Sequence, residues 1–190
     1  MNKGLVSITG CLCALIAITG CGQDQSCNKT APTPPPRPAE LDRLEAWVGL
    51  WDNTGEMKAC NGQVMKSHSS HDVKWDLNKT ILIERYAGEM EGMGKFNSIG
   101  IYCYDYRKKE FKYRSIGENG DTMHGDLDYN EKTCTWTMET KGYNPMMKMC
   151  VTGKGTFKFP DAQTIEWTWK EWDGLHLFKL FEGHGTVKRK

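Results

Sequence analysis

The chain has 190 residues, enough for one domain of ordinary size, and its formal net charge is +1. Without Lys3, the one charged residue among the first twenty, the charge falls to zero. A chain without net charge lacks the basic surface that attracts phosphates, so we exclude nucleic acid as its main partner. Seven Trp, seven Tyr and six Phe supply apolar area for a core, and twenty Gly favour strands and turns over helices.

Residues 1–20 are predicted to be an export signal. A short basic start precedes an uncharged, mostly apolar run over residues 5–18, which is too short for a comfortable membrane span. The run ends Ile18-Thr19-Gly20-Cys21, which resembles the bacterial lipobox. The resemblance implies that Cys21 carries two acyl chains, becomes the mature N-terminus and holds the protein on membrane lipid. The alternative is an ordinary cleaved signal followed by a chance cysteine.

Residues 21–38 are predicted to be a disordered, proline-rich tether, because they hold five of the seven prolines and little apolar area to bury. By analogy with the sorting of bacterial lipoproteins, the absence of Asp after Cys21 permits placement in the outer membrane. We therefore expect an exported, membrane-anchored protein of the cell envelope, on the periplasmic side or the cell surface. The remaining domain is expected to span residues 39–190.

The spacing of apolar residues changes at Gly49-x-Trp51. Before this point Leu41, Leu44, Trp47 and Val48 follow helical i, i+3, i+4 spacing, and after it the apolar residues mostly alternate in twos. We expect a short helix that ends at Gly49, a strand that begins at Leu50, and a helix position that closes one end of an antiparallel β-barrel.

Nine further strands are predicted from about Gln63 onward, with turn signals between them. The clearest alternation lies in residues 134–139 and is repeated in residues 165–170. The last turn is placed at residues 172–174, and the last strand, with apolar residues on both faces, at 175–188. Short turns without intervening helices favour an all-β, up-and-down meander that closes into a lipocalin-like barrel of about ten strands. A β-sandwich is the alternative.

Several segments resemble a bacterial lipocalin-like family of unknown function that is common in exported proteins. They are Trp75-Asp76-Leu77, residues 100–105, the strand around Gly125 and the terminal residues 188–190, and the helix with Gly49-x-Trp51 is similar to the start of lipocalin-like and nitrobindin-like barrels. The resemblance covers residues 41–190 and implies a β-barrel with a central pocket and no assigned activity. Nitrobindins bind haem through a His, but no His here matches that ligand, so no cofactor is expected.

The proposed pocket is lined by side chains assigned to the inner face of the strands. These candidates are Trp51, Tyr102, Trp136, Met138, Trp167, Trp169 and His184. They favour a small apolar or amphipathic ligand held by burial of apolar area. Two other functions stay open: an enzyme that uses the same cavity with His184 or His124 as acid or base, and a filled barrel that acts through its surface. No catalytic signature is present, so no catalytic residue is assigned.

Five cysteines follow Cys21. Cys134 and Cys150 flank the loop at residues 142–145, so a disulfide between them is one prediction, and a pair of Cys60 with Cys103 is a second. The alternative is that these residues are buried free thiols.

No metal site is expected. Cys60, His68 and His71 lack a metal-binding spacing, and the two histidines point to opposite faces of a regular strand. We interpret both as solvated loop histidines. Met147 and Met149 share a strand face and offer soft sulfur ligands for Cu(I), but packing in the core is favoured.

Overall fold

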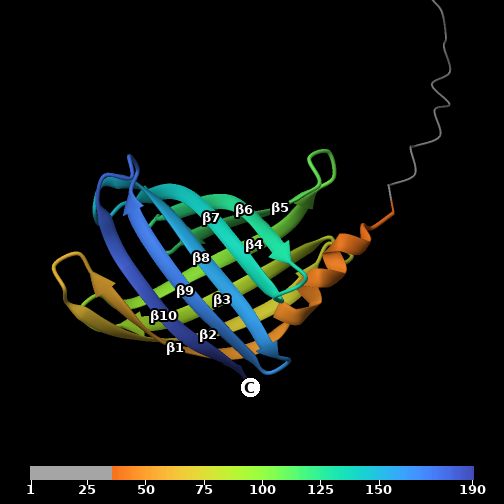
Figure 1. The fold of residues 1–190 in the computed structure, drawn as a ribbon, viewed down its shortest axis with the longest axis horizontal. Coiled ribbons are helices and arrows are strands. Elements are labelled where there is room, and N and C mark those ends of the chain that lie inside the picture. Colours follow the sequence, from red (N-terminus) through yellow and green to blue (C-terminus); the bar gives the residue numbers. More distant parts are fainter. Residues whose placement is uncertain (1–35) are drawn as a thin grey trace, which may run out of the picture. The chain divides into compact units, whose positions relative to one another are not determined.

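The computed structural model describes residues 36–190, in which one short helix is followed by ten strands (Figure 1). The predicted lipidation site Cys21 and most of the predicted tether lie outside the described residues. The elements are η1 (Ala39–Trp47), β1 (Gly49–Ala59), β2 (Val64–Asp76), β3 (Ile81–Met90), β4 (Gly94–Asp105), β5 (Glu110–Gly117), β6 (Thr122–Asn130), β7 (Thr135–Asn144), β8 (Met149–Asp161), β9 (Thr164–Asp173) and β10 (Lys179–Arg189). No helix within residues 36–190 is long and apolar enough to cross a membrane.

The strands form one closed antiparallel barrel in which each strand pairs with its neighbours in the sequence. The barrel closes where β1 pairs with β10, for example Thr54 opposite Thr186. This arrangement confirms the predicted up-and-down barrel and excludes the sandwich. Because the first and last strands pair, the described sheet has no exposed edge that would recruit another strand.

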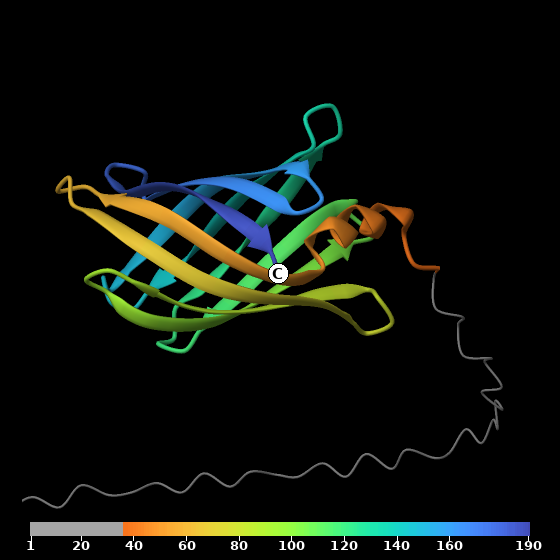
Figure 2. The same ribbon diagram turned by 90° about the horizontal axis from the view of Figure 1, so that it is seen from below.

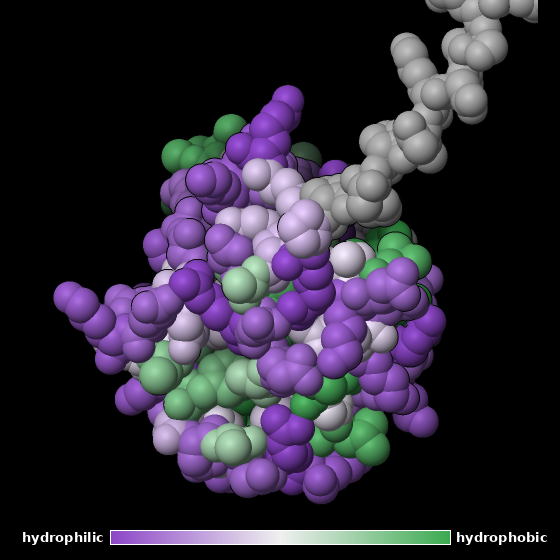
Figure 3. All heavy atoms as spheres, turned by 90° about the vertical axis from the view of Figure 1, so that its right-hand side faces the viewer, coloured by the Kyte–Doolittle hydropathy of each residue, from purple (hydrophilic) through white to green (hydrophobic). Residues whose placement is uncertain are grey.

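The helix lies at one end of the barrel, which we call the helix end (Figure 2). It is a 3-10 helix, and its buried residues Leu41, Leu44 and Trp47 are spaced by three, which matches three residues per turn. Trp51 Nε1 donates to the Trp47 carbonyl oxygen at 2.8 Å, and this bond ties the helix to β1. Seen from the helix end, most surface atoms are hydrophilic, and hydrophobic atoms gather mainly in the lower half of the view (Figure 3).

Gly49 makes the transition from helix to strand possible. Its φ of 140° lies in a region that residues with side chains rarely adopt, and an added Cβ would meet Arg189 Nη1 at 2.4 Å. That guanidinium instead donates to the Val48 carbonyl oxygen at 2.5 Å and lies 4.1 Å from the centre of the Trp51 ring. The last strand therefore fastens the helix in place.

The predicted last hairpin is wrong in its boundaries. β9 continues to Asp173, and β10 begins only at Lys179, so residues 174–178 form a loop. The Asp173 carboxylate accepts the backbone N–H of Phe178 at 2.6 Å and that of Leu175 at 3.3 Å. Leu175 and Phe178 are 77% and 68% exposed. A run with apolar residues on both faces resembled a strand, but these side-chain bonds hold it as a turn.

The predicted disulfide between Cys134 and Cys150 is also wrong, because both residues are free thiols, as are Cys60 and Cys103. Cys134 precedes β7, whereas Cys150 pairs with Tyr143 near the other end of that strand. Ten residues of strand separate them by about 30 Å, and a disulfide needs Cα atoms within about 7 Å. The two cysteines flank a loop in the sequence, but one of them lies a whole strand away from it.

Candidate functional site

A cavity of about 380 Å³ lies inside the barrel. It extends from Trp47 and Trp51 at the helix end toward Met57 and Met90, which lie near the far ends of β1 and β3. The far end is the opposite end of the barrel, where short turns join the strands and no described helix lies. The described helix therefore covers the cavity at one end of the barrel and not at the other.

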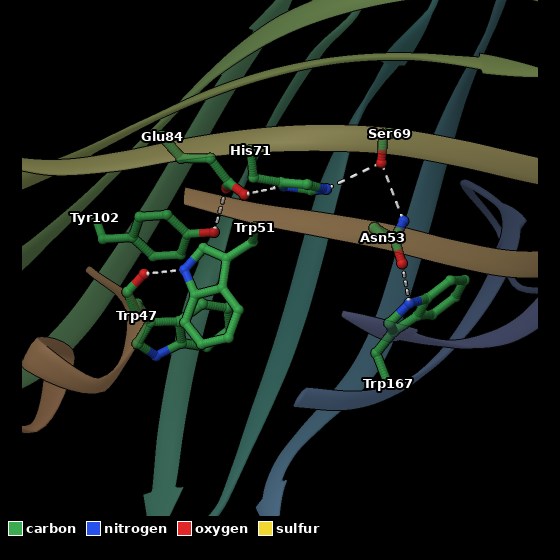
Figure 4. A network of polar contacts seen from close by, with 8 residues as sticks. All are labelled: Trp47, Trp51, Asn53, Ser69, His71, Glu84, Tyr102 and Trp167. Atoms are coloured by element: carbon green, nitrogen blue, oxygen red, sulfur yellow. Dashed lines mark hydrogen bonds and ion pairs between the residues drawn. The ribbon is translucent and has the colours of Figure 1, made fainter. Parts of the chain in front are cut away.

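His71 is the centre of a chain of hydrogen bonds in the cavity wall (Figure 4). Its Nδ1 lies 2.6 Å from Glu84 Oε1, and its Nε2 lies 3.0 Å from Ser69 Oγ. Asn53 Nδ2 donates to Ser69 Oγ at 3.0 Å, and Trp167 Nε1 donates to Asn53 Oδ1 at 2.7 Å. The chain joins residues from β1, β2, β3 and β9 along the inner face.

A neutral His71 ring can complete this whole chain of hydrogen bonds. If the proton of neutral His71 is on Nδ1, it is donated to Glu84, and Nε2 accepts the hydroxyl proton of Ser69. Tyr102 donates its hydroxyl to the second carboxylate oxygen, Glu84 Oε2, at 2.7 Å. The side chains of His71 and Glu84 are 18% and 10% exposed, so these bonds lie largely out of water. Hydrogen bonds within the wall thus hold each polar group of this chain in place.

The neighbouring phenols remain protonated at physiological pH. Burial raises the pKa of Tyr86 to about 12, with a further increase from the Glu84 charge and a decrease from the Ser98 hydrogen bond. Burial, followed by the Glu84 charge, also raises the pKa of Tyr102 well above its ordinary value. The Tyr86 ring stacks on His71 with 5.4 Å between the ring centres. Tyr102 therefore acts as a hydrogen-bond donor to Glu84.

The register of the first three strands brings the residues of this hydrogen-bonded chain together. Trp51 lies opposite His71, which lies opposite Tyr86, and Asn53 lies opposite Ser69. Residues two apart on a strand share a face, so Ser69 and His71 both point inward from β2. Of the two, Ser69 is nearer the far end because β2 runs toward the helix end.

Glycines on the inner wall make room for two tryptophans. A Cβ added to Gly185 would lie 2.7 Å from the Trp167 ring, and one added to Gly153 would lie 2.2 Å from the Trp169 ring. Because these positions have no side chain, the indoles lie close against the wall instead of projecting into the barrel. Bare wall positions of this kind keep the cavity open.

The predicted pocket residues do not all line the cavity. Trp51, Tyr102, Trp167 and Trp169 line the cavity. Trp136 and Met138 are 1% and 3% exposed and belong to the packed core, outside the cavity lining. Because a cavity remains, the interior is not completely filled, as the filled-barrel alternative would require.

The prediction that His184 lines the pocket is wrong. His184 is exposed on the outer face of β10, between Glu56 of β1 and Thr168 of β9, and borders a surface groove. The inner face of β10 is formed instead by residues 183, 185 and 187. His124 is exposed on the outer face of β6, so neither histidine proposed as acid or base reaches the cavity.

Asn53, Ser69 and Glu84 were not among the predicted site residues, and His71 was interpreted as a solvated loop residue. His68 and His71 do point to opposite faces, since His68 borders outer grooves while His71 lines the cavity. Both faces of β2 are polar around these residues, so alternation could not tell which face was inside. Within residues 36–190 no cluster of three or more His, Cys, Asp or Glu side chains is arranged to hold a metal ion.

Solved structures with a similar fold include the following two. The S-type phycobiliprotein lyase CPES from Guillardia theta matches with a TM-score of 0.57 at 11% identity, over 81% of this chain and 94% of that one. The protein Rv2717c from M. tuberculosis matches with a TM-score of 0.64 at 13% identity, over 80% of this chain and 98% of that one. At these identities the likeness establishes the fold alone, a closed ten-stranded lipocalin-like barrel.

The sequence itself was compared with curated proteins and with protein families. No curated protein matches the chain. Residues 38–174, from just before the helix to the end of β9, match the family described as "Protein of unknown function (DUF1579)". The match covers most of the chain and nearly all of the barrel, and the protein therefore belongs to the DUF1579 family.

Proposed function

We propose that this protein binds a small apolar or amphipathic molecule inside its barrel while acyl chains on Cys21 hold it in the cell envelope. The observation that carries the binding role is the cavity of about 380 Å³, which is lined by aromatic rings and one polar row. Pockets for small ligands commonly measure about 300–1,000 Å³ and combine an apolar lining with a few placed polar groups.

The arrangement of the polar groups indicates what kind of ligand fits. Each hydrogen-bonding group from Trp167 through His71 to Glu84 already has a partner within the wall. A ligand with many polar groups would have to replace those bonds, whereas an apolar ring or chain would displace only water. Burial contributes about 25 cal/mol for each Å² of apolar surface removed from water, so an apolar body supplies most of the affinity.

Binding can be tested with N-phenyl-1-naphthylamine, a small aromatic fluorophore whose emission rises in apolar surroundings. We expect saturable emission on titration into the purified protein, together with quenching of Trp fluorescence. Trp169→Ala should weaken binding about tenfold, which corresponds to roughly 1.4 kcal/mol. Trp172→Ala is the matched control, because Trp172 stacks on His176 and does not line the cavity. Absence of saturable binding, or equal weakening in both variants, would contradict a cavity site.

The envelope location is supported by the lipobox-like Ile18-Thr19-Gly20-Cys21 after an apolar run. If Cys21 is acylated, the protein should sediment with membranes and resist extraction by high salt. Cys21→Ala should prevent acylation and change that distribution, whereas Cys60→Ala should leave it unaltered. A Cys21→Ala protein that carried the same lipid mass as wild type would exclude this anchor.

A further inference from the structure

Ser69, His71 and Glu84 have the relative positions of a nucleophile, a base and an orienting carboxylate. Ser69 Oγ lies 3.0 Å from His71 Nε2, and the other ring nitrogen lies 2.6 Å from Glu84 Oε1. Both distances fall in the range of about 2.6–3.2 Å found where a base activates a serine. We propose that Ser69 is an activated nucleophile that accepts acyl groups from small apolar carboxylic esters. The proposal rests on the proposed function, because the ester must enter the cavity.

The surroundings of the three residues support their separate roles. Tyr102 donates to Glu84 Oε2 at 2.7 Å, so the carboxylate keeps its other oxygen directed at His71. Glu84 therefore acts as a positioning residue that holds the Nδ1–H tautomer and leaves Nε2 free to accept a proton. The stacked Tyr86 ring further limits rotation of the imidazole.

Ser69 is also placed where a substrate would meet it. It lines the cavity and lies nearer the far end than His71, so a molecule that enters from that end reaches the hydroxyl first. Asn53 Nδ2 lies 3.0 Å from Ser69 Oγ. This bond holds the Ser69 hydroxyl oxygen in place beside His71.

The reaction balances with water as the second reactant. Ser69 Oγ bonds to the carbonyl carbon of the ester, and its proton passes to His71 Nε2. The bond from that carbon to the alkoxy oxygen then breaks, and the departing alcohol takes the proton from His71, which leaves acyl-Ser69. Water attacks the acyl carbon while His71 takes a proton from it. Ser69 leaves with that proton, so that one carboxylic acid and one alcohol are released.

Ser67 provides a matched comparison within the same strand. It also lines the cavity, but its hydroxyl donates to the Gly55 carbonyl oxygen at 3.3 Å and has no histidine partner. If the pairing with His71 is what activates Ser69, a serine-directed reagent that enters the cavity should distinguish the two hydroxyls.

The test is to treat the purified protein with phenylmethanesulfonyl fluoride and to map the adduct by peptide mass spectrometry. We expect one phenylmethanesulfonyl group on Ser69, none on Ser67, and loss of labelling in Ser69→Ala. His71→Gln should slow labelling at least about a hundredfold, as expected for loss of a general base. The rate at which p-nitrophenol is released from p-nitrophenyl butyrate should likewise fall in Ser69→Ala and in His71→Gln.

Fluorophore binding separates this proposal from the binding function. If N-phenyl-1-naphthylamine binds but wild-type Ser69 takes no label, Ser69 is not a nucleophile and the binding function stands. If Ser69 is labelled without fluorophore binding, the nucleophile is supported and the binding proposal fails. Equal labelling of Ser67 and Ser69, or labelling that survives His71→Gln, would overturn activation by His71. Mapping on the wild-type protein keeps the result independent of how well any variant folds.

Discussion

The two ends of the barrel interior are built by the same alternation of side chains but differ in what fills them. At the helix end the centre of the Trp47 ring lies 5.2 Å from that of Phe157 and 5.7 Å from that of Tyr102, so large aromatic side chains pack between the helix and the wall. Toward the far end, glycines replace large residues, and the indoles of Trp167 and Trp169 lie against the bare wall. Because both ends belong to the same ten-stranded barrel, the size of the inward residues decides which end is packed and which is hollow.

The largest expected effect is at the helix end. Trp136 is 1% exposed, and its ring packs against Phe111 and Tyr129, so Trp136→Ala should lower the free energy of unfolding by about 3–5 kcal/mol. Trp169→Ala should cost less, because one face of that ring already borders the cavity. Urea denaturation of both variants measures the difference. Equal losses would mean that the two ends are packed alike.

The next effect concerns the buried carboxylate between the two ends. Tyr102→Phe removes the hydroxyl that donates to Glu84 and should lower the free energy of unfolding by about 1.5–3 kcal/mol, as for other hydrogen bonds to charged groups. Tyr106→Phe is the control, since Tyr106 is 45% exposed. If the urea midpoints of both variants move equally, the hydrogen bond from Tyr102 to Glu84 does not stabilise the fold.

At the hollow end, a single methyl group should move the wall into the cavity. The Cβ of Gly153→Ala would lie 2.2 Å from the Trp169 ring, which must swing inward. Overpacking of this kind costs about 1–3 kcal/mol, and the displaced ring should also weaken binding of N-phenyl-1-naphthylamine. A variant that binds the fluorophore with unchanged affinity would show that Trp169 does not limit the space.

The smallest effect is a dependence of stability on pH at the far end. Burial raises the pKa of Glu171, although a hydrogen bond from Trp169 partly opposes this. The folded state therefore favours the protonated acid, so this group's contribution is fully present below pH about 4.3 and is lost as the pH rises through the raised value. Glu171→Gln should remove that loss and stabilise the protein at pH 7, as measured by urea midpoints at pH 4 and pH 7.

Glu182 serves as the opposite case. The hydrogen bond from Lys179 lowers the pKa of Glu182, so its contribution is present above the unfolded value and is lost as the pH falls through the folded one. Glu182→Gln should therefore reduce stability slightly at pH 7 and change little at pH 4, because the group is exposed and screened by water. If both variants shifted the midpoints in the same direction, burial would not be the cause at Glu171.

The strands and their order follow from local features of the sequence. Alternation and turn residues are local properties, so they predicted the helix before Gly49, the up-and-down meander and a barrel of about ten strands. The predicted start of the last strand was wrong, because the Asp173 carboxylate holds the apolar residues within 174–178 in a turn. Trp167 and Trp169 were also predicted, because apolar and polar side chains alternate along β9.

The polar half of the site depends on contacts between strands, which local patterns do not show. Around Ser69 and His71 both faces of β2 are polar, so the inner face is set by pairing with β1 and β3. Glu84 lies 13 residues from His71 in the chain, and the two meet because the register of neighbouring strands places them together. The same long-range pairing put His184 outside and separated Cys134 from Cys150. Residues that are distant in the chain meet only when the strands pair, and local sequence patterns do not predict that pairing.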